Sequence, residues 1–190
     1  ALTSGSYNVA VGFEALSTCA EGLHNTAVGY QALKTMEASG QGYNTGIGYL
    51  AGTALTSGVG NTAIGHQALD LATTAVNNVA LGKNSMSSVP AGVAVTGCVA
   101  IGESALIAPS ITTGADNTIA IGASALAALT SGSKNIAIGY QALTAEDDGD
   151  NNIAIGYQAM SAAANGELDN IALGYYALGN LNDASSDNNI

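Results

Sequence analysis

Residues 61–69, Asn-Thr-Ala-Ile-Gly-His-Gln-Ala-Leu, decide the fold, because close copies of this stretch recur ten times along the chain. Counted from their glycines, successive copies are 17–20 residues apart. Such a period predicts a repeat array in which each unit buries its apolar face only by stacking on its neighbours. The ten glycines are Gly12, Gly29, Gly48, Gly65, Gly82, Gly102, Gly122, Gly139, Gly156 and Gly174.

Each copy alternates large and small apolar residues before its glycine, which we take as position 0. Position −1 is always aliphatic and position −3 is always β-branched, while position −2 is alanine in every copy except one, which has Gly46. Alternation with period two is typical of a β-strand. The sequence therefore predicts an all-β, parallel β-solenoid (β-roll) rod with one coil per 17–20 residues. We expect residues 1–190 to form a single array of ten coils, a section of a longer fibre.

Position −4 is predicted to form a ladder of polar side chains. It is asparagine in eight copies, and Cys98 and Thr118 replace it in the other two. Stacked coils bring these amides into line, so that they can hydrogen-bond along the rod. The second half of each copy, Gly-x-x-Ala-Leu, is compatible with a second short strand or with a helical turn, since glutamine, alanine and leucine favour helix.

The small residues at position −2 bear on assembly. A lone coil of this length would need bulkier residues to fill a wide interior at native packing density. We therefore expect the face of alanine and glycine to pack flat against other copies of the chain. A homotrimer is one solution, although the pattern does not count the copies.

Composition disfavours several classes of function. The formal net charge is −11, with 14 acidic residues against three lysines, so binding to nucleic acid or to an anionic membrane surface is not expected. No apolar run reaches the roughly 18 residues of a membrane span, so no membrane insertion is expected in this segment. Cys19 and Cys98 lie five coils apart, about 24 Å at the spacing of stacked strands, and are predicted to be unlinked.

Several copies resemble repeats of known fibrous proteins. Asn-Ile-Ala-Ile-Gly at 135–139 and 152–156 and Cys-Val-Ala-Ile-Gly at 98–102 resemble the head repeats of trimeric autotransporter adhesins. The longer copies at 25–33 and 61–69 resemble repeats of phage tail fibres and of large bacterial surface proteins. The resemblance covers essentially the whole chain, although the period is longer than in the adhesins and asparagine mostly replaces serine. It implies a parallel β-roll in a homotrimer, an extracellular location on a cell surface or virion, and no catalytic residue.

Position +1 is the most suggestive candidate for binding. Lys83 and Glu103 occupy it in two copies, so we expect the column to be at least partly exposed. Aromatic rings in such a column can stack on sugar rings, or they can form a ladder that only stabilises the rod. The candidate binding residues are Tyr30, Tyr49, Tyr140, Tyr157 and Tyr175, and Phe13 and His66 share their position.

Metal and catalytic chemistry has few candidates. Asp150 and Glu167 share one repeat position in the acidic loops, which makes them weak candidates for a Ca²⁺ site, with a solvated acidic edge as the alternative. His24 and His66 occupy different repeat positions two coils apart, so a shared metal is not expected. Residues 46–51 fit a dinucleotide-binding pattern, but they are only a repeat copy without a βαβ unit. No catalytic or cofactor-binding residue is predicted, and the chain is not expected to be an enzyme.

These features favour a structural or adhesive fibre segment, a shaft that holds a receptor-binding tip away from a cell or virion. The expected partners are other copies of the chain and a host-surface or glycan receptor, contacted through loops or tyrosines. A β-solenoid enzyme acting on polysaccharide is one alternative, because such enzymes place clustered acids on one face. An ice-binding solenoid is another, for which only Thr26, Thr45 and Thr62 align.

Overall fold

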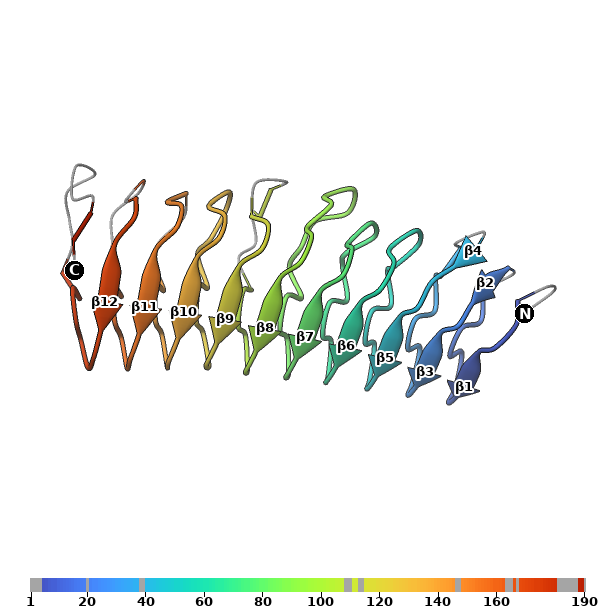
Figure 1. Ribbon diagram of the computed structural model, residues 1–190. Helices are drawn as coiled ribbons and strands as arrows, with labels where there is room; N and C mark the ends of the chain where they lie inside the picture. The colour runs from blue at the N-terminus through green and yellow to red at the C-terminus, as the bar shows by residue number, and fades with distance from the viewer. Residues whose placement is uncertain are drawn as a thin grey trace.

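The protein is a rod of coils that follow one another in chain order (Figure 1). The computed structural model describes residues 5–19, 21–37, 40–107, 111–112, 115–145, 148–162, 166, 168–180 and 188–189. We call each coil with its strand a rung. The coils turn sharply at one edge of the rod, and loops of varying length line the opposite edge. The predicted parallel β-solenoid is confirmed.

Ten strands of three residues form one parallel sheet, ordered as in the chain. Pairing is in register, as where Ala137 lies opposite Ala154. The strands of this sheet are β1 (Val9–Val11), β3 (Thr26–Val28), β5 (Thr45–Ile47), β6 (Thr62–Ile64), β7 (Val79–Leu81), β8 (Val99–Ile101), β9 (Ile119–Ile121), β10 (Ile136–Ile138), β11 (Ile153–Ile155) and β12 (Ile171–Leu173).

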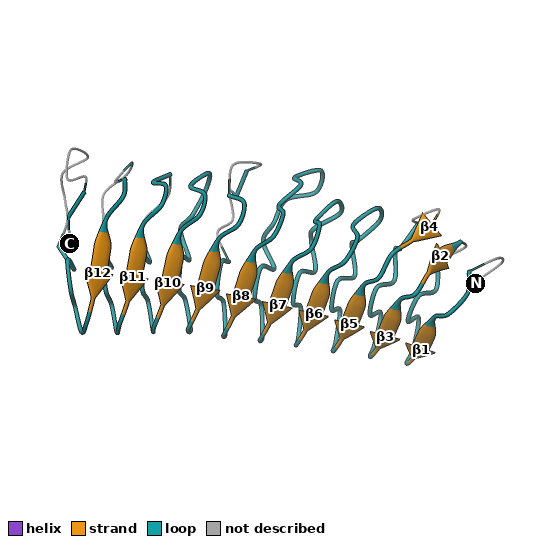
Figure 2. Cartoon of the chain, in the orientation of Figure 1, coloured by secondary structure: helices purple, strands orange, loops and turns teal. Residues whose placement is uncertain are grey.

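A second, small sheet pairs β2 (Gly22–Leu23) with β4 (Gly40–Gln41) near the N-terminal end of the rod. The remaining described residues form turns and loops (Figure 2). The described part of the chain contains no helix. It therefore contains no helix that is long and apolar enough to cross a membrane.

A column of glycines ends the strands of the large sheet. Gly139 has φ +139°, and a Cβ added there would collide with the carbonyl group of Gly156 on the next rung. The other glycines at position 0 share this backbone conformation, with φ between +128° and +144°. Because side chains disfavour this φ and the next rung leaves no space, glycine is required. The ten glycines that recur in the sequence therefore form a single column along the rod.

The Gly-x-x-Ala-Leu half of each coil is neither a strand nor a helical turn. Positions +2 and +4 take positive φ, for example +53° at Gln31 and +47° at Leu33. The N–H of Gln31 donates to the carbonyl of Phe13 on the preceding rung at 2.8 Å. The N–H of Leu33 donates to the carbonyl of Ala51 on the following rung at 3.0 Å. These bonds tie each turn to both neighbouring coils and offset the cost of left-handed backbone at residues with a Cβ.

The core is narrow, and alanine and leucine fill it. From the second rung onward the alanines at position −2, such as Ala137 and Ala154, are buried inside their own chain, whereas Ala10 on the first rung is exposed. A Cβ added at Gly46, in the same column, would lie only 2.7 Å from Cγ of Leu33. The prediction that this face packs against other chains is therefore wrong. The coil is flattened, so its interior leaves room for little more than a methyl group opposite each leucine.

The predicted asparagine ladder is confirmed. Both the backbone N–H and the side-chain amide of Asn61 donate to Oδ1 of Asn44 on the preceding rung, at 2.9 and 3.0 Å. Nδ2 of Asn61 also donates to the carbonyl of Ala75 at 2.7 Å. Asn78 repeats the contact to Asn61 one rung further on. Because these asparagines are buried, the ladder satisfies polar groups that water does not reach.

Cys98 takes the place of an asparagine within the ladder. Its N–H donates to Oδ1 of Asn78 at 2.8 Å, and its Sγ lies 3.0 Å from the carbonyl oxygen of Ala115. Burial raises the pKa of this thiol to about 11, so it stays protonated and keeps its S–H donor. Cys19 is also buried, and the two thiols are unlinked, as predicted.

Candidate functional site

Two columns of mostly aliphatic side chains cover the outer face of the large sheet. They are positions −1 and −3, and no copy has a charged residue at either. The column at position −1 stays partly exposed even in the middle of the rod, where 36% of Ile47 and 41% of Leu81 are accessible. Three polar residues interrupt the column at position −3, on adjacent rungs: Thr26, Thr45 and Thr62. An uncharged stripe of this length, apolar apart from the three threonines, is a surface suited to contact with another molecule.

Position +1 forms two separate aromatic stacks along the rod. Ring centroids within them are 5.0–5.4 Å apart, with interplanar angles of 9–18°. The first stack contains Phe13, Tyr30, Tyr49 and His66, and the second contains Tyr140, Tyr157 and Tyr175. The rings lie one above another on successive rungs, as the ladder alternative requires.

This stacking covers ring faces that a sugar would need. Tyr30, Tyr49 and Tyr157 each have a ring on both sides and expose mainly their edges and hydroxyl groups. A sugar that contacts these three residues would therefore have to do so at the ring edges or the hydroxyl groups. Tyr175 stacks on Tyr157 and also lies at a tilt against Tyr176, 6.5 Å away. Tyr140 differs, since the ring contact that the described residues give it is with Tyr157 alone.

Three rungs separate the two stacks. They carry Lys83, Glu103 and Ala123 at position +1. Nζ of Lys83 lies 2.9 Å from the Glu103 carboxylate, and both side chains are more than half exposed. The asparagine ladder is also altered on two of these rungs, by Cys98 and Thr118. The middle of the rod therefore departs from the repeat in two columns at once.

A third aromatic stack, which the sequence analysis missed, lies before the strands at position −5. Tyr7, His24 and Tyr43 stack there on successive rungs, with centroids 4.8 and 5.1 Å apart. This position holds an aromatic ring in only three copies, so no column stands out in the repeat as a whole. The signal that could have revealed the stack was an aromatic residue five positions before the glycine in three consecutive copies. His24 and His66 lie in different stacks, in agreement with their different repeat positions.

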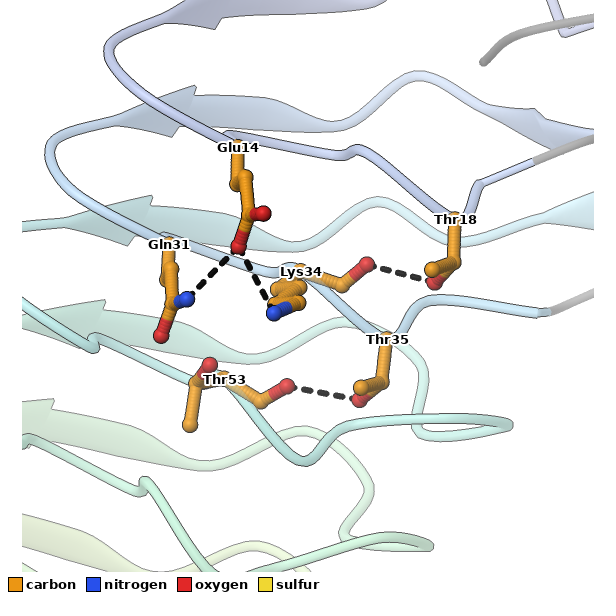
Figure 3. A network of polar contacts seen from close by, with 6 residues as sticks. All are labelled: Glu14, Thr18, Gln31, Lys34, Thr35 and Thr53. Atoms are coloured by element: carbon orange, nitrogen blue, oxygen red, sulfur yellow. Dashed lines mark hydrogen bonds and ion pairs between the residues drawn. The ribbon is translucent and has the colours of Figure 1, made fainter.

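Polar side chains outside the sheet join the first coils to one another (Figure 3). Glu14 accepts a hydrogen bond from Nε2 of Gln31 at 2.6 Å and pairs with Nζ of Lys34 at 2.7 Å. The hydrogen bonds from Lys34 and then Gln31 lower the pKa of the Glu14 carboxyl. Thr18 donates to the Lys34 carbonyl at 2.6 Å. Every one of these contacts links one rung to the next, so the network stabilises the rod.

The candidate metal residues are only partly placed. Asp150 uses Oδ1 to accept hydrogen bonds from the backbone N–H of Ser133 at 2.6 Å and from its hydroxyl at 3.1 Å. Glu167 lies outside the described residues. In the described part of the chain, no three His, Cys, Asp or Glu side chains come together as a metal site would require. The Ca²⁺ site remains a sequence prediction.

Asp70 is a buried carboxyl that the sequence analysis did not single out. Only 7% of the residue is exposed. Oδ2 accepts a hydrogen bond from Nε2 of Gln67 at 3.1 Å, whereas Oδ1 has no hydrogen-bond partner among the described residues. Burial raises the pKa of this carboxyl, against a smaller opposing effect of the Gln67 bond.

A pocket of about 350 Å³ lies at the C-terminal rung. Its lining consists of Ile171, Ala172, Leu173, Ala177 and Leu178. These side chains are all aliphatic, so they offer no group for acid–base or nucleophilic chemistry.

Comparison of the chain with models of protein families, with curated proteins and with solved structures finds no match.

Proposed function

We propose that the chain is a structural segment of an extracellular fibre, a shaft that holds an adhesive tip away from a cell surface or virion. The observation that supports this most is the uncharged outer face of the ten-stranded sheet. The glycine column, the asparagine ladder and the aromatic stacks all run along the rod. Each added rung therefore lengthens the molecule without needing a separate core.

The outer face suits assembly with further copies of the chain into a homotrimer. Around a threefold axis, each copy can present position −1 to one neighbour and position −3 to the other. Rungs in every copy repeat at about 4.8 Å whatever the loop length, so the columns stay in register along the rod. Apolar area removed from water contributes roughly 25 cal/mol per Å², and this face has no charge to desolvate. The proposed interface is this aliphatic face, in place of the buried alanines.

The mass of the purified chain in solution tests the assembly. Analytical ultracentrifugation is expected to give three times the chain mass of 18.6 kDa. Changing Ile121→Asp together with Ile138→Asp places two charges on paired residues of β9 and β10. We expect this variant to sediment as a folded monomer, because burial of the charges would be costly.

The matched control is Ser124→Asp together with Gln141→Asp. These residues lie on the same two rungs but outside the strands, and aspartate tolerates their positive φ. The control is expected to remain a trimer. A monomeric natural chain, or a trimer that survives the isoleucine changes, contradicts the proposed assembly.

We further propose that the shaft contacts glycans of a receptor. The stacked tyrosines and the loops supply exposed hydroxyl, amide and aromatic groups at regular intervals, which are the groups that bind sugars. Binding of the purified chain to a glycan array tests this, and release of any hydrolysis product there would favour the alternative of a polysaccharide-acting enzyme.

A further inference from the structure

One ring face of Tyr140 lies over a small residue. Tyr157 covers the other face, with the centroids 5.2 Å apart. The N–H of Gln141 donates to the carbonyl of Ala123 at 3.0 Å, which places Ala123 on the rung directly before Tyr140. Tyr140 is 46% exposed. The second stack therefore ends above a methyl group and not above another ring.

Glu103 lies one rung beyond Ala123. The N–H of Ser124 donates to the carbonyl of Glu103 at 3.0 Å, which fixes this order. Tyr140 and Glu103 are thus two rungs apart, about 10 Å at the usual strand spacing. Ring centroids elsewhere in the column are 5.0–5.4 Å apart, so one further ring fits at the level of Ala123. The ion pair of Lys83 and Glu103 then forms the polar wall opposite the tyrosine.

We propose that a neutral pyranose sugar binds at this level, with its C–H face on Tyr140 and its hydroxyl groups on Glu103 and Lys83. Sugar hydroxyls both donate and accept, so one ring can bond to the carboxylate and to the ammonium group. An apolar ring would stack equally well but would leave that ion pair partly desolvated without compensation. An acidic sugar would be repelled by a chain whose net charge is −11. The proposal rests on the glycan-contacting function above and assigns that contact to one site.

Tyr43 provides an internal comparison. It also ends a stack, with His24 5.1 Å away on one side, and it is 51% exposed. Position −5 of the next rung is Gly60, so small residues adjoin both tyrosines. The Tyr43 hydroxyl bonds to Gln41, and no charged residue occupies its column in the first five copies. If an open ring end were enough, sugars would bind at Tyr43 and Tyr140 alike.

Saturation-transfer NMR on the full chain tests the site, with methyl β-galactopyranoside and methyl β-glucopyranoside as probes. We expect transfer to the C–H protons of one sugar face, with a dissociation constant on the order of 1 mM, as is reasonable for one ring in an open site. Tyr140→Ala and Ala123→Tyr should each weaken binding at least tenfold. Glu103→Gln should weaken it several-fold, and Tyr43→Ala should leave it unchanged.

Ala123→Tyr is the most informative variant, because the new ring would continue the stack and so keep the fold. Circular dichroism checks that fold. Three results overturn the proposal: no transfer to either sugar, binding that survives Ala123→Tyr, or an equal loss with Tyr43→Ala. Stronger binding of p-cresol than of either sugar also overturns it, in favour of an aromatic side chain of a partner. If the chain is a trimer but binds no sugar, only the proposed sugar site is contradicted. If the chain is a monomer but binds sugar, only the proposed assembly is contradicted.

Discussion

At the scale of single residues, the rod depends on atoms that lie between adjacent rungs. Position 0 needs glycine for two reasons, its positive φ and the closeness of the next glycine carbonyl. Gly174 is instructive, because its φ of +128° is similar but nothing lies within 4 Å of an added Cβ. The two causes can therefore be separated experimentally.

Gly139→Ala is expected to destabilise the protein much more than Gly174→Ala. Both variants carry the roughly 1–3 kcal/mol of a strained backbone. Only Gly139→Ala adds the collision with Gly156, at a further cost of roughly 1–3 kcal/mol. Urea denaturation followed by circular dichroism measures both. Equal losses for the two variants would mean that φ alone decides this position.

Asp70 predicts an unusual dependence of stability on pH. Unfolded, its carboxyl titrates near a pKa of about 3.9, and burial raises the pKa in the folded chain. The folded state therefore binds this proton more tightly. The contribution of Asp70 to the free energy of unfolding increases as pH falls through the folded pKa, and at neutral pH the buried carboxylate is destabilising.

Asp70→Asn removes that charge and keeps the shape of the side chain. We expect a higher melting temperature than that of the natural chain at pH 7, and a difference that shrinks as the pH approaches 4. Thermal unfolding at a series of pH values measures this. A difference that does not change with pH would show that the charge of Asp70 is not the cause.

At the scale of elements, no strand of three residues would be stable alone. Each strand gains stability from what flanks it: the asparagine ladder before it and the turns with positive φ after it. The ladder matters most where it is continuous, as from Asn44 to Asn78, because each side-chain amide there contacts both the preceding and the following rung.

Asn61→Ala is therefore expected to be costly. It leaves the buried N–H of Asn78 without its acceptor, at a cost of roughly 1–3 kcal/mol for the unsatisfied group. It also removes one of the two donors to the carbonyl of Ala75, which keeps the N–H of Val59 at 3.2 Å. Thr118→Asn should have the opposite effect, because it restores a missing member of the ladder. Melting temperatures of the two variants test this. A neutral Asn61→Ala would show that the ladder is only a consequence of stacking.

At the scale of the whole molecule, the rod is modular. Its coils contact their sequence neighbours, and every pairing in the large sheet joins consecutive rungs. Deletion of residues 140–156 removes one whole period and joins Gly139 to Tyr157. We expect a folded protein that is one rung shorter, with Tyr157 taking the place of Tyr140 above Ala123.

Deletion of residues 148–156 is the control for this shortening. It removes β11 and Gly156 but leaves the other half of the coil, so β10 would have no strand to pair with on the next rung. We expect loss of the sharp unfolding transition that the whole-period deletion keeps. Equal behaviour of the two deletions, measured by circular dichroism on heating, would contradict the modular description.

The sequence by itself determined the features that recur in every copy. The strands, the glycine column, the asparagine ladder and the column at position +1 follow from a fixed offset to the glycine, because parallel in-register stacking brings equal offsets together. The tyrosine candidates were therefore placed in the correct column.

Only the tertiary structure decided which side of each strand faces inward. Alternation gives two faces but does not say which is the core, and the alanine face became the core because the coil is flat. The positive φ of Gln31 and Leu33 also had no signal, since it is cross-rung bonding and not local preference that stabilises this conformation. Whether a ring face is open depends on what lies on the next rung. That contact distinguishes Tyr140 from Tyr157, although both occupy the same position in the repeat.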